Sequence, residues 1–376
     1  MKKTLPIKID ASIQTECWTY NKLCILETSP YSDAWISSNF GIYMDSEYLV
    51  CLGRMNNTFY LNEFSNILEI SEMDYWENTP NTIMDTIETE LQKGNYLVIY
   101  LMLSVEVHTI HEFVFYGFDS EKHELYTLMI DQGTFKKKTV TYDWFITRYK
   151  NLFDYHLYNP DNIAWFGSNF FPVTKIKVRD DFDDSICFVE AMRRFNEELF
   201  GKRILISNPI TSTEEQCLTG IECINGISLR VKEYIRDQQF IQGNTLKKLS
   251  FEMKRNVCKL YEHHCVVNKS MKWIIKQVEA PHEHYIQLHW NLCKRMKKLA
   301  MLSLKFDITG DWDILNKMDK GLENLYDDVR DSLVGFIDSV TDLRKKYNKA
   351  SYNDLLKKHP SILAEAEHFK DEQVVL

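Results

Sequence analysis

The stretch HTIHEFVFYGFDSEKHELYTLMIDQG, residues 108–133, contains two apolar runs separated by a short polar segment. The runs EFVFYGFD (112–119) and ELYTLMID (124–131) are rich in aromatic and β-branched residues, which predicts an antiparallel β-hairpin. His111 precedes the first strand and Asp131 closes the second, so we expect the two side chains to lie side by side at the open end of the hairpin. The hairpin can therefore present a histidine–aspartate pair.

The composition narrows the classes of protein that this chain can belong to. Its 376 residues are 44% hydrophobic, which is enough for a sizeable core and two domains. The net charge of −9, without a long Lys/Arg block, argues against a nucleic-acid partner. The chain has no apolar run near the roughly 18 residues that span a bilayer, and the N-terminus lacks the apolar region of a secretory signal. Because none of the nine cysteines forms a CxxC motif, we expect reduced thiols in a cytoplasmic protein with no cofactor.

Residues 1–178 are expected to form an α+β domain with an antiparallel sheet. Two helices are predicted there, CWTYNKLCILET (17–28) and TPNTIMDTIETELQKG (79–94), the second with Pro80 in its first turn and Gly94 as its stop. Further strands are predicted at FGIYM (40–44), YLVCLG (48–53), TFYLNEF (58–64), NYLVIYLMLS (95–104) and KKKTVTYD (136–143).

Residues 179–376 are expected to form an all-α domain. In residues 311–347, apolar residues recur mostly at three- and four-residue steps, which lays one stripe along a helix face. The other predicted helices span residues 188–203, 225–240, 246–277 and 282–304.

A cysteine nucleophile needs a position that favours the thiolate, such as the first turn of a helix beside a histidine, with a carboxylate or amide to fix the imidazole tautomer. Cys17 opens a predicted helix, with Thr15 available as its cap. Cys24 lies two turns further along, where a thiol would pack as a small apolar group. Cys17, His111 and Asp131 are therefore the candidate catalytic residues, and His108 is the alternative base. A strand-edge histidine or a helix-opening cysteine is also common as a purely structural residue.

The histidines of the second half do not form a recognisable metal motif. His263, His264, His282, His284 and His289 fall on two predicted helices, but without the Glu-x-x-His or His-Glu-x-x-His spacing of metal sites. We therefore predict no metal. The basic segment KRMKKLAMLSLK (294–305) fits either a solvated helix face or a contact with an acidic carrier protein.

The order of these elements resembles the C39-like branch of the papain-like superfamily, and more closely the family of butirosin biosynthesis protein H. The resemblance covers most of the chain and is most specific in residues 108–119. In the opening pattern, Cys17 is followed by Cys24 and Ile25, and in the histidine strand His111 stands in register with Gly117 and Asp119. Residues 140–149, 226–235 and 260–274 are similar to further segments of the family.

The resemblance implies a papain-like fold with a Cys-His-Asp site. In the family's founding member this site moves an aminoacyl group from a carrier-protein thioester to an amine of an aminoglycoside. The implied function is a cysteine-dependent acyltransferase, or a thioester or amide hydrolase, in natural-product (antibiotic) biosynthesis. The implied partners are an acyl carrier protein and a small amine acceptor, with neither nucleic acid nor membrane.

Two departures from the family pattern keep an alternative open. Trp18 and its neighbours replace a histidine-bearing segment, and Gln14 lies only three residues before Cys17, nearer than the oxyanion-hole glutamine of papain-like enzymes. The alternative is a catalytically inactive accessory or binding protein on the same fold.

The helical half is expected to line one side of a cleft beside Cys17 and His111, since clefts between domains are preferred ligand sites. Its candidate binding residues are Tyr261, His264 and Trp273.

Overall fold

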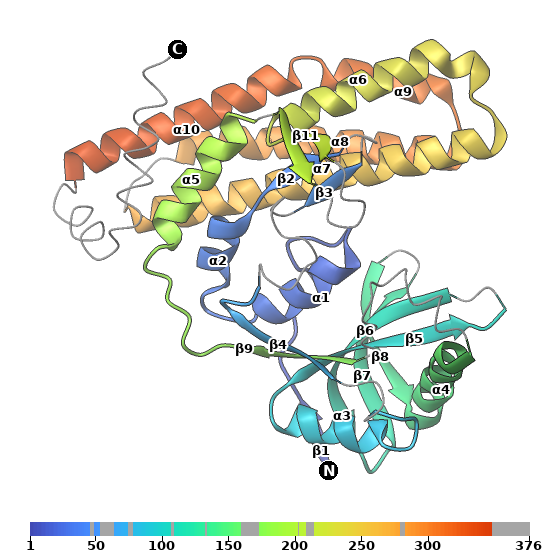
Figure 1. The fold of residues 1–376 in the computed structure, drawn as a ribbon. Coiled ribbons are helices and arrows are strands. Elements are labelled where there is room, and N and C mark those ends of the chain that lie inside the picture. Colours follow the sequence, from blue (N-terminus) through green and yellow to red (C-terminus); the bar gives the residue numbers. More distant parts are fainter. Residues whose placement is uncertain are drawn as a thin grey trace. The chain divides into compact units, whose positions relative to one another are not determined.

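The computed structural model confirms a mixed α+β protein with an antiparallel sheet and a helical C-terminal region. It divides into two compact units (Figure 1), and each is described by itself. Unit 1 comprises Met1–Ser32 and Asn56–Phe182, and unit 2 comprises Asp33–Met55 and Asp183–Leu376. The structure describes residues 1–45, 49–52, 64–73, 78–106, 109–131, 134–158, 173–201, 203–207, 214–278 and 283–347.

Unit 1 is built on one antiparallel sheet in the order β4-β9-β5-β6-β7-β8, with β1 paired to β6. Large aromatic residues fill its core, among them Phe113 and Phe115 of the sheet and Phe145 of a covering helix. The elements are β1 (Lys2–Thr4), α1 (Cys17–Leu26), β4 (Leu68–Met73), α3 (Ile83–Gln92), β5 (Tyr96–Ser104), β6 (Thr109–Asp119), β7 (Glu124–Asp131), β8 (Thr134–Thr141), α4 (Tyr142–Tyr158) and β9 (Val173–Val178).

The hairpin predicted from residues 108–133 is confirmed as β6 and β7, and β7 has the predicted bounds. Gly117 lies at a β-bulge of β6, where β1 passes so close that a Cβ on this glycine would stand 2.6 Å from the carbonyl oxygen of Lys3. A side chain there would push β1 off the sheet.

The predicted strand at 136–143 is corrected, because β8 ends at Thr141 and the chain turns directly into α4. The strand predicted at residues 58–64 lies outside the described residues, except for Phe64, which is in a turn.

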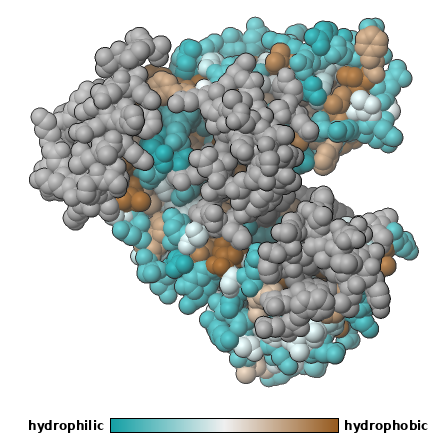
Figure 2. Space-filling model, viewed as in Figure 1, coloured by the Kyte–Doolittle hydropathy of each residue, from teal (hydrophilic) through white to brown (hydrophobic). Residues whose placement is uncertain are grey.

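Unit 2 consists of long helices that run side by side (Figure 1) and a small four-stranded sheet. Where Figure 2 shows its surface, apolar residues stand in small groups among polar ones. The elements are α2 (Ser32–Asn39, which begins on the last residue of unit 1), β2 (Ile42–Met44), β3 (Val50–Leu52), α5 (Cys187–Leu199), β10 (Arg203–Ser207), β11 (Glu214–Thr219), α6 (Glu222–Asp237), η2 (a 3-10 helix, Gln238–Phe240), α7 (Gly243–Gln277), α8 (Glu283–Thr309), α9 (Trp312–Leu322) and α10 (Leu325–Tyr347).

The predicted all-α second half is wrong for residues 203–207 and 214–219, which form the paired strands β10 and β11. The division into units also differs from the predicted boundary between 178 and 179. Residues 33–55 cluster with the second unit, because β11 pairs with β2 and β2 pairs with β3. Local patterns identified β2 and β3 as strands, but their partner strand lies about 170 residues further along the chain, and sequence patterns carry no information on such pairing.

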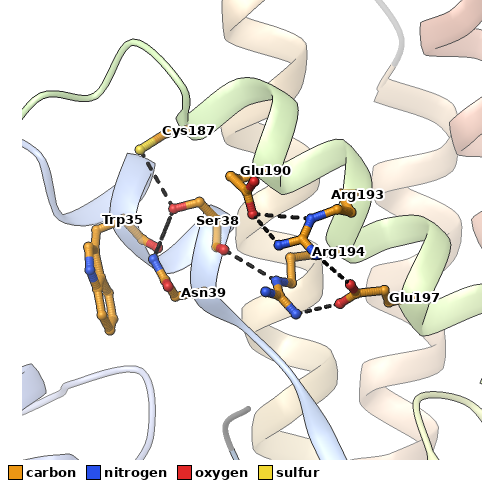
Figure 3. A network of polar contacts seen from close by, with 8 residues as sticks. All are labelled: Trp35, Ser38, Asn39, Cys187, Glu190, Arg193, Arg194 and Glu197. Atoms are coloured by element: carbon orange, nitrogen blue, oxygen red, sulfur yellow. Dashed lines mark hydrogen bonds and ion pairs between the residues drawn. The ribbon is translucent and has the colours of Figure 1, made fainter. Parts of the chain in front are cut away.

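Polar contacts hold α2 against α5 within unit 2 (Figure 3). The Ser38 hydroxyl donates to the Cys187 sulfur at 3.6 Å, and the Arg194 guanidinium donates to the Ser38 carbonyl oxygen at 3.4 Å. Within α5, Arg193 forms ion pairs with both Glu190 and Glu197. The buried Ser38 and Arg194 therefore have hydrogen-bond partners at this junction, as buried polar groups usually do.

Side chains of α7 complete the edge of the four-stranded sheet. The backbone N–H of Val50 donates to Asn256 Oδ1 at 3.0 Å, and its carbonyl oxygen accepts from Lys259 Nζ at 2.7 Å. Both side chains are buried, with exposed fractions of 4% and 2%. The edge strand β3 is thus held by one helix in place of another strand.

The apolar stripe predicted in residues 311–347 is buried as expected, from Leu315 to Val340. It belongs to two helices, α9 and α10, since the chain turns at Asn324 with a φ of 58°. Among the described residues, no helix has both the length and the apolar content needed to cross a membrane.

Candidate active site

The first turn of α1 holds the candidate nucleophile. Cys17 is the first helical residue, and Glu16 occupies the N-cap without a side-chain capping bond, so the predicted cap at Thr15 is wrong. The rest of the helix is fixed by burial of its apolar side chains and by Tyr20, whose ring stacks on Phe135 of β8 with centroids 3.5 Å apart. The first N–H groups of a helix have no acceptor within it, so this turn favours negative charge.

The candidate histidine base comes from β6. His111 pairs with Leu101 of β5, and its Nε2 lies 3.6 Å from the Cys17 Sγ atom. Both side chains are partly buried. The structure therefore brings the two predicted residues Cys17 and His111 together, at a distance that suits a nucleophile–base pair. The alternative base, His108, lies outside the described residues.

A backbone carbonyl orients the imidazole. The His111 Nδ1 atom lies 3.0 Å from the carbonyl oxygen of Glu112. Because a carbonyl oxygen only accepts hydrogen bonds, this contact requires the proton on Nδ1. Nε2 is then left with its lone pair toward the Cys17 sulfur, which is the tautomer that can take a proton from the thiol.

Asp131, the third predicted member, lies elsewhere. The paired part of β6 and β7 ends at Val114 and Leu128. Beyond it, among the described residues, β6 pairs with β5 alone, and Asp131 pairs with Thr134 of β8. No hydrogen bond joins Asp131 to His111 among the described residues. Instead, the Asp131 carboxylate receives Lys138 at 2.8 Å and Lys136 at 3.2 Å, and these lysines lower its pKa.

Tyr100 lies near Glu112 and Cys17, and the sequence had not identified it as part of the site. It lies opposite Glu112 on β5. Burial, and then the negative charges of Glu112 and of a Cys17 thiolate, raise the pKa of the Tyr100 phenol well above its ordinary value. The phenol therefore keeps its proton at neutral pH. Its position between two apolar residues, Ile99 and Leu101, was the available sequence signal.

The remaining thiols have other environments. All nine cysteines lie in the described part of the chain, and none of them forms a disulfide. Cys24 is completely buried in α1, and its burial strongly raises the pKa of its thiol, in agreement with the packing role expected for it. Burial also raises the pKa of Cys258, on α7, to about 11. Gln14, three residues before Cys17, donates its amide to the Ala11 carbonyl oxygen at 3.4 Å.

The predicted binding residues of the helical half all lie on α7. Tyr261 and Trp273 are half-buried, whereas His264 is completely buried, with its ring 5.2 Å from that of His263 and 5.4 Å from that of His289. They belong to unit 2, while Cys17 and His111 belong to unit 1. Their role as one wall of a cleft stays a prediction.

The buried histidines do not assemble into a metal centre. Within the described ranges, no three His, Cys, Asp or Glu side chains are placed to share a metal ion. His263 instead pairs with Glu198 of α5, at 3.0 Å between Nε2 and Oε2.

Comparison with known proteins adds no assignment. The chain matches no protein-family model, and none of the curated proteins matches it.

Proposed function

We propose that this protein is a cysteine-dependent acyltransferase, or a related thioester or amide hydrolase, with Cys17 as nucleophile and His111 as base. One observation carries the proposal: Cys17 lies in the first turn of a helix, with its sulfur 3.6 Å from His111 Nε2. Because the other ring nitrogen, Nδ1, donates its proton to the Glu112 carbonyl oxygen, Nε2 is free to accept the thiol proton. A thiol in this position is activated by the imidazole and by the helix terminus together.

The proposal includes a papain-like organisation of unit 1. Two features support it: the nucleophile opens a helix, α1, that packs on an antiparallel sheet, and a strand of this sheet, β6, carries the base. In the proposal the Glu112 carbonyl fixes the tautomer, the task that the sequence reading gave to Asp131.

The chemistry follows from these groups. His111 takes the thiol proton, and the Cys17 thiolate attacks the carbonyl carbon of a thioester or amide. First-turn N–H groups of α1 are suited to receive the developing oxyanion. The protonated imidazole then gives its proton to the leaving thiol or amine, which leaves the acyl group on Cys17. An amine or water attacks this acyl-enzyme, loses a proton to His111 and releases the amide or acid.

The donor and acceptor classes come from the family resemblance. They are an acyl thioester on a carrier protein and a small amine, within a natural-product pathway. The competing function is a non-catalytic binding protein on the same fold. The contacts of Asp131 favour this competing function, because its carboxylate pairs with two lysines and is not placed to orient the His111 imidazole.

Alkylation separates the two functions. The intact protein is treated with iodoacetamide over a range of pH values, and each labelled cysteine is identified by peptide mass. Cys17 is expected to react well below pH 8, with a rate that falls in His111→Asn. Cys258 is the internal control, because its raised pKa of about 11 makes it slow under the same conditions. If Cys17 reacts as slowly as Cys258, or keeps its rate in His111→Asn, the catalytic proposal is wrong.

A second measurement tests acyl transfer itself. The protein is incubated with a simple acyl thioester, such as an acyl-N-acetylcysteamine, and its intact mass is recorded with and without an added amine. A single acyl adduct that forms on the native protein, is absent in Cys17→Ala and disappears faster with the amine supports an acyltransferase. An activated Cys17 that forms no adduct with thioesters or amides supports the binding protein.

A further inference from the structure

The outer face of α8 carries a continuous line of exposed side chains. Its members follow one another at alternating steps of four and three residues, the spacing that keeps side chains in line when two helices pack along their length. Four of them are exposed apolar side chains, namely Trp290 (37% exposed), Met301 (60%), Leu304 (39%) and Ile308 (75%). The full line is Trp290, Lys294, Lys297, Met301, Leu304 and Ile308.

This line is positively charged, although the whole chain has a net charge of −9. From His284 to Phe306 the helix contains no acidic residue. Lys294 and Lys297 stand in the line itself, and Lys298 and Lys305 flank it, all exposed. Within the part of the chain that the structure describes, none of these four lysines forms an ion pair. The only partner of the Lys294 ammonium group there is an amide oxygen, Asn291 Oδ1, at 3.4 Å.

We propose that this face of α8 docks an acidic amphipathic helix of a partner protein. The partner helix would set carboxylates against Lys294 and Lys297 and apolar side chains against Met301, Leu304 and Ile308. Charge complementarity selects this occupant, because carboxylates at the same spacing satisfy both ammonium groups while the apolar half is covered.

Two other occupants fit this face less well. A second copy of the same helix would set lysines against lysines if the helices were parallel, and lysines against Met301 and Leu304 if they were antiparallel. In both cases the ammonium groups would be buried without counter-charges. A bilayer accepts helices whose apolar face is continuous and whose lysines lie along its borders. Here Lys294 and Lys297 interrupt the apolar line between Trp290 and Met301, so insertion would bury both.

The test uses a fluorescein-labelled helical peptide with leucine and glutamate at the matching spacing, and a second peptide with lysine in place of glutamate. Binding to the full-length protein is followed by anisotropy at low and high salt. The acidic peptide is expected to bind, with an affinity that falls as salt rises. The double variant Lys294→Glu/Lys297→Glu is expected to bind the acidic peptide at least about tenfold more weakly and to acquire binding of the basic peptide.

The matched control is Lys247→Glu/Lys276→Glu, which makes the same change in net charge at exposed positions of α7 and leaves the α8 face intact. It is expected to retain wild-type binding of the acidic peptide. The proposal is overturned if the native protein does not bind the acidic peptide at low salt, or if both double variants lose affinity equally. Binding to vesicles of anionic phospholipid that the α8 variant abolishes, without binding of the peptide, would assign the face to a membrane instead.

Discussion

Two buried histidines make the helical unit sensitive to acid. His264 and His289 have no exposed surface, and their rings lie 5.4 Å apart between α7 and α8. Around them are His263 with its partner Glu198, and Ser332, whose hydroxyl lies 3.4 Å from His289 Nδ1. Burial, followed by the charge of His263, lowers the pKa of His264 well below its ordinary value and that of His289 to about 3.

The sign and size of the effect follow from these pKa values. An unfolded chain binds a proton at each histidine near pH 6.5, whereas the folded unit keeps both rings neutral. Below about pH 6.5 the unfolded state therefore holds more protons, and the free energy of unfolding falls as the pH falls. Each histidine steepens this fall by about 1.4 kcal/mol per pH unit. For His289, the interval from 6.5 to about 3 corresponds to a loss of about 5 kcal/mol, as large as the whole stability of many proteins.

Urea unfolding followed by far-UV circular dichroism at several pH values between about 5 and 7.5 measures this slope. His289→Asn is expected to reduce the slope by up to about 1.4 kcal/mol per pH unit, whatever it does to stability at neutral pH. His284→Asn is the matched control, because this exposed side chain on the same helix stays in water in both states. A slope in His289→Asn equal to that of the native protein would show that the ring is not held neutral, and the reasoning would fail.

Three further changes test the site and the scaffold. Asp131→Asn is expected to leave the alkylation rate of the nucleophilic thiol unchanged, since the carboxylate binds lysines and does not contact His111; a large decrease would restore it to the site. Asn256→Leu is expected to lower the free energy of unfolding by about 1–3 kcal/mol, because the buried N–H of Val50 loses its acceptor; denaturant titration measures this loss. Gly117→Ala is expected to cost about 1–3 kcal/mol by forcing the β1 backbone away, and an unchanged melting temperature would contradict the close approach.

The sequence predicted the pairing of Cys17 with His111 for a physical reason. The bounds of a hairpin follow from turn residues and alternating apolar positions, and the start of a helix is marked where its apolar residues begin, so His111 and Cys17 could be placed on their elements. The prediction for Asp131 assumed that the β6–β7 ladder continues to the open end. The ladder ends at Val114 and Leu128, because twisted strands separate and each pairs with its other neighbour. No local pattern encodes where this happens.

The contact of the Glu112 carbonyl with His111 could not be predicted from the sequence, since every residue carries the same backbone atoms. Its place at the imidazole has a chemical consequence. A carbonyl fixes the tautomer of His111 as a carboxylate does, but it brings no full negative charge to an imidazolium. In the proposed reaction, the thiolate of Cys17 would then have to be stabilised mainly by the first turn of α1. Because the apolar side chains of α1 and the stacking of Tyr20 on Phe135 hold that turn against the sheet, the precision of the site rests on regular elements and not on loops.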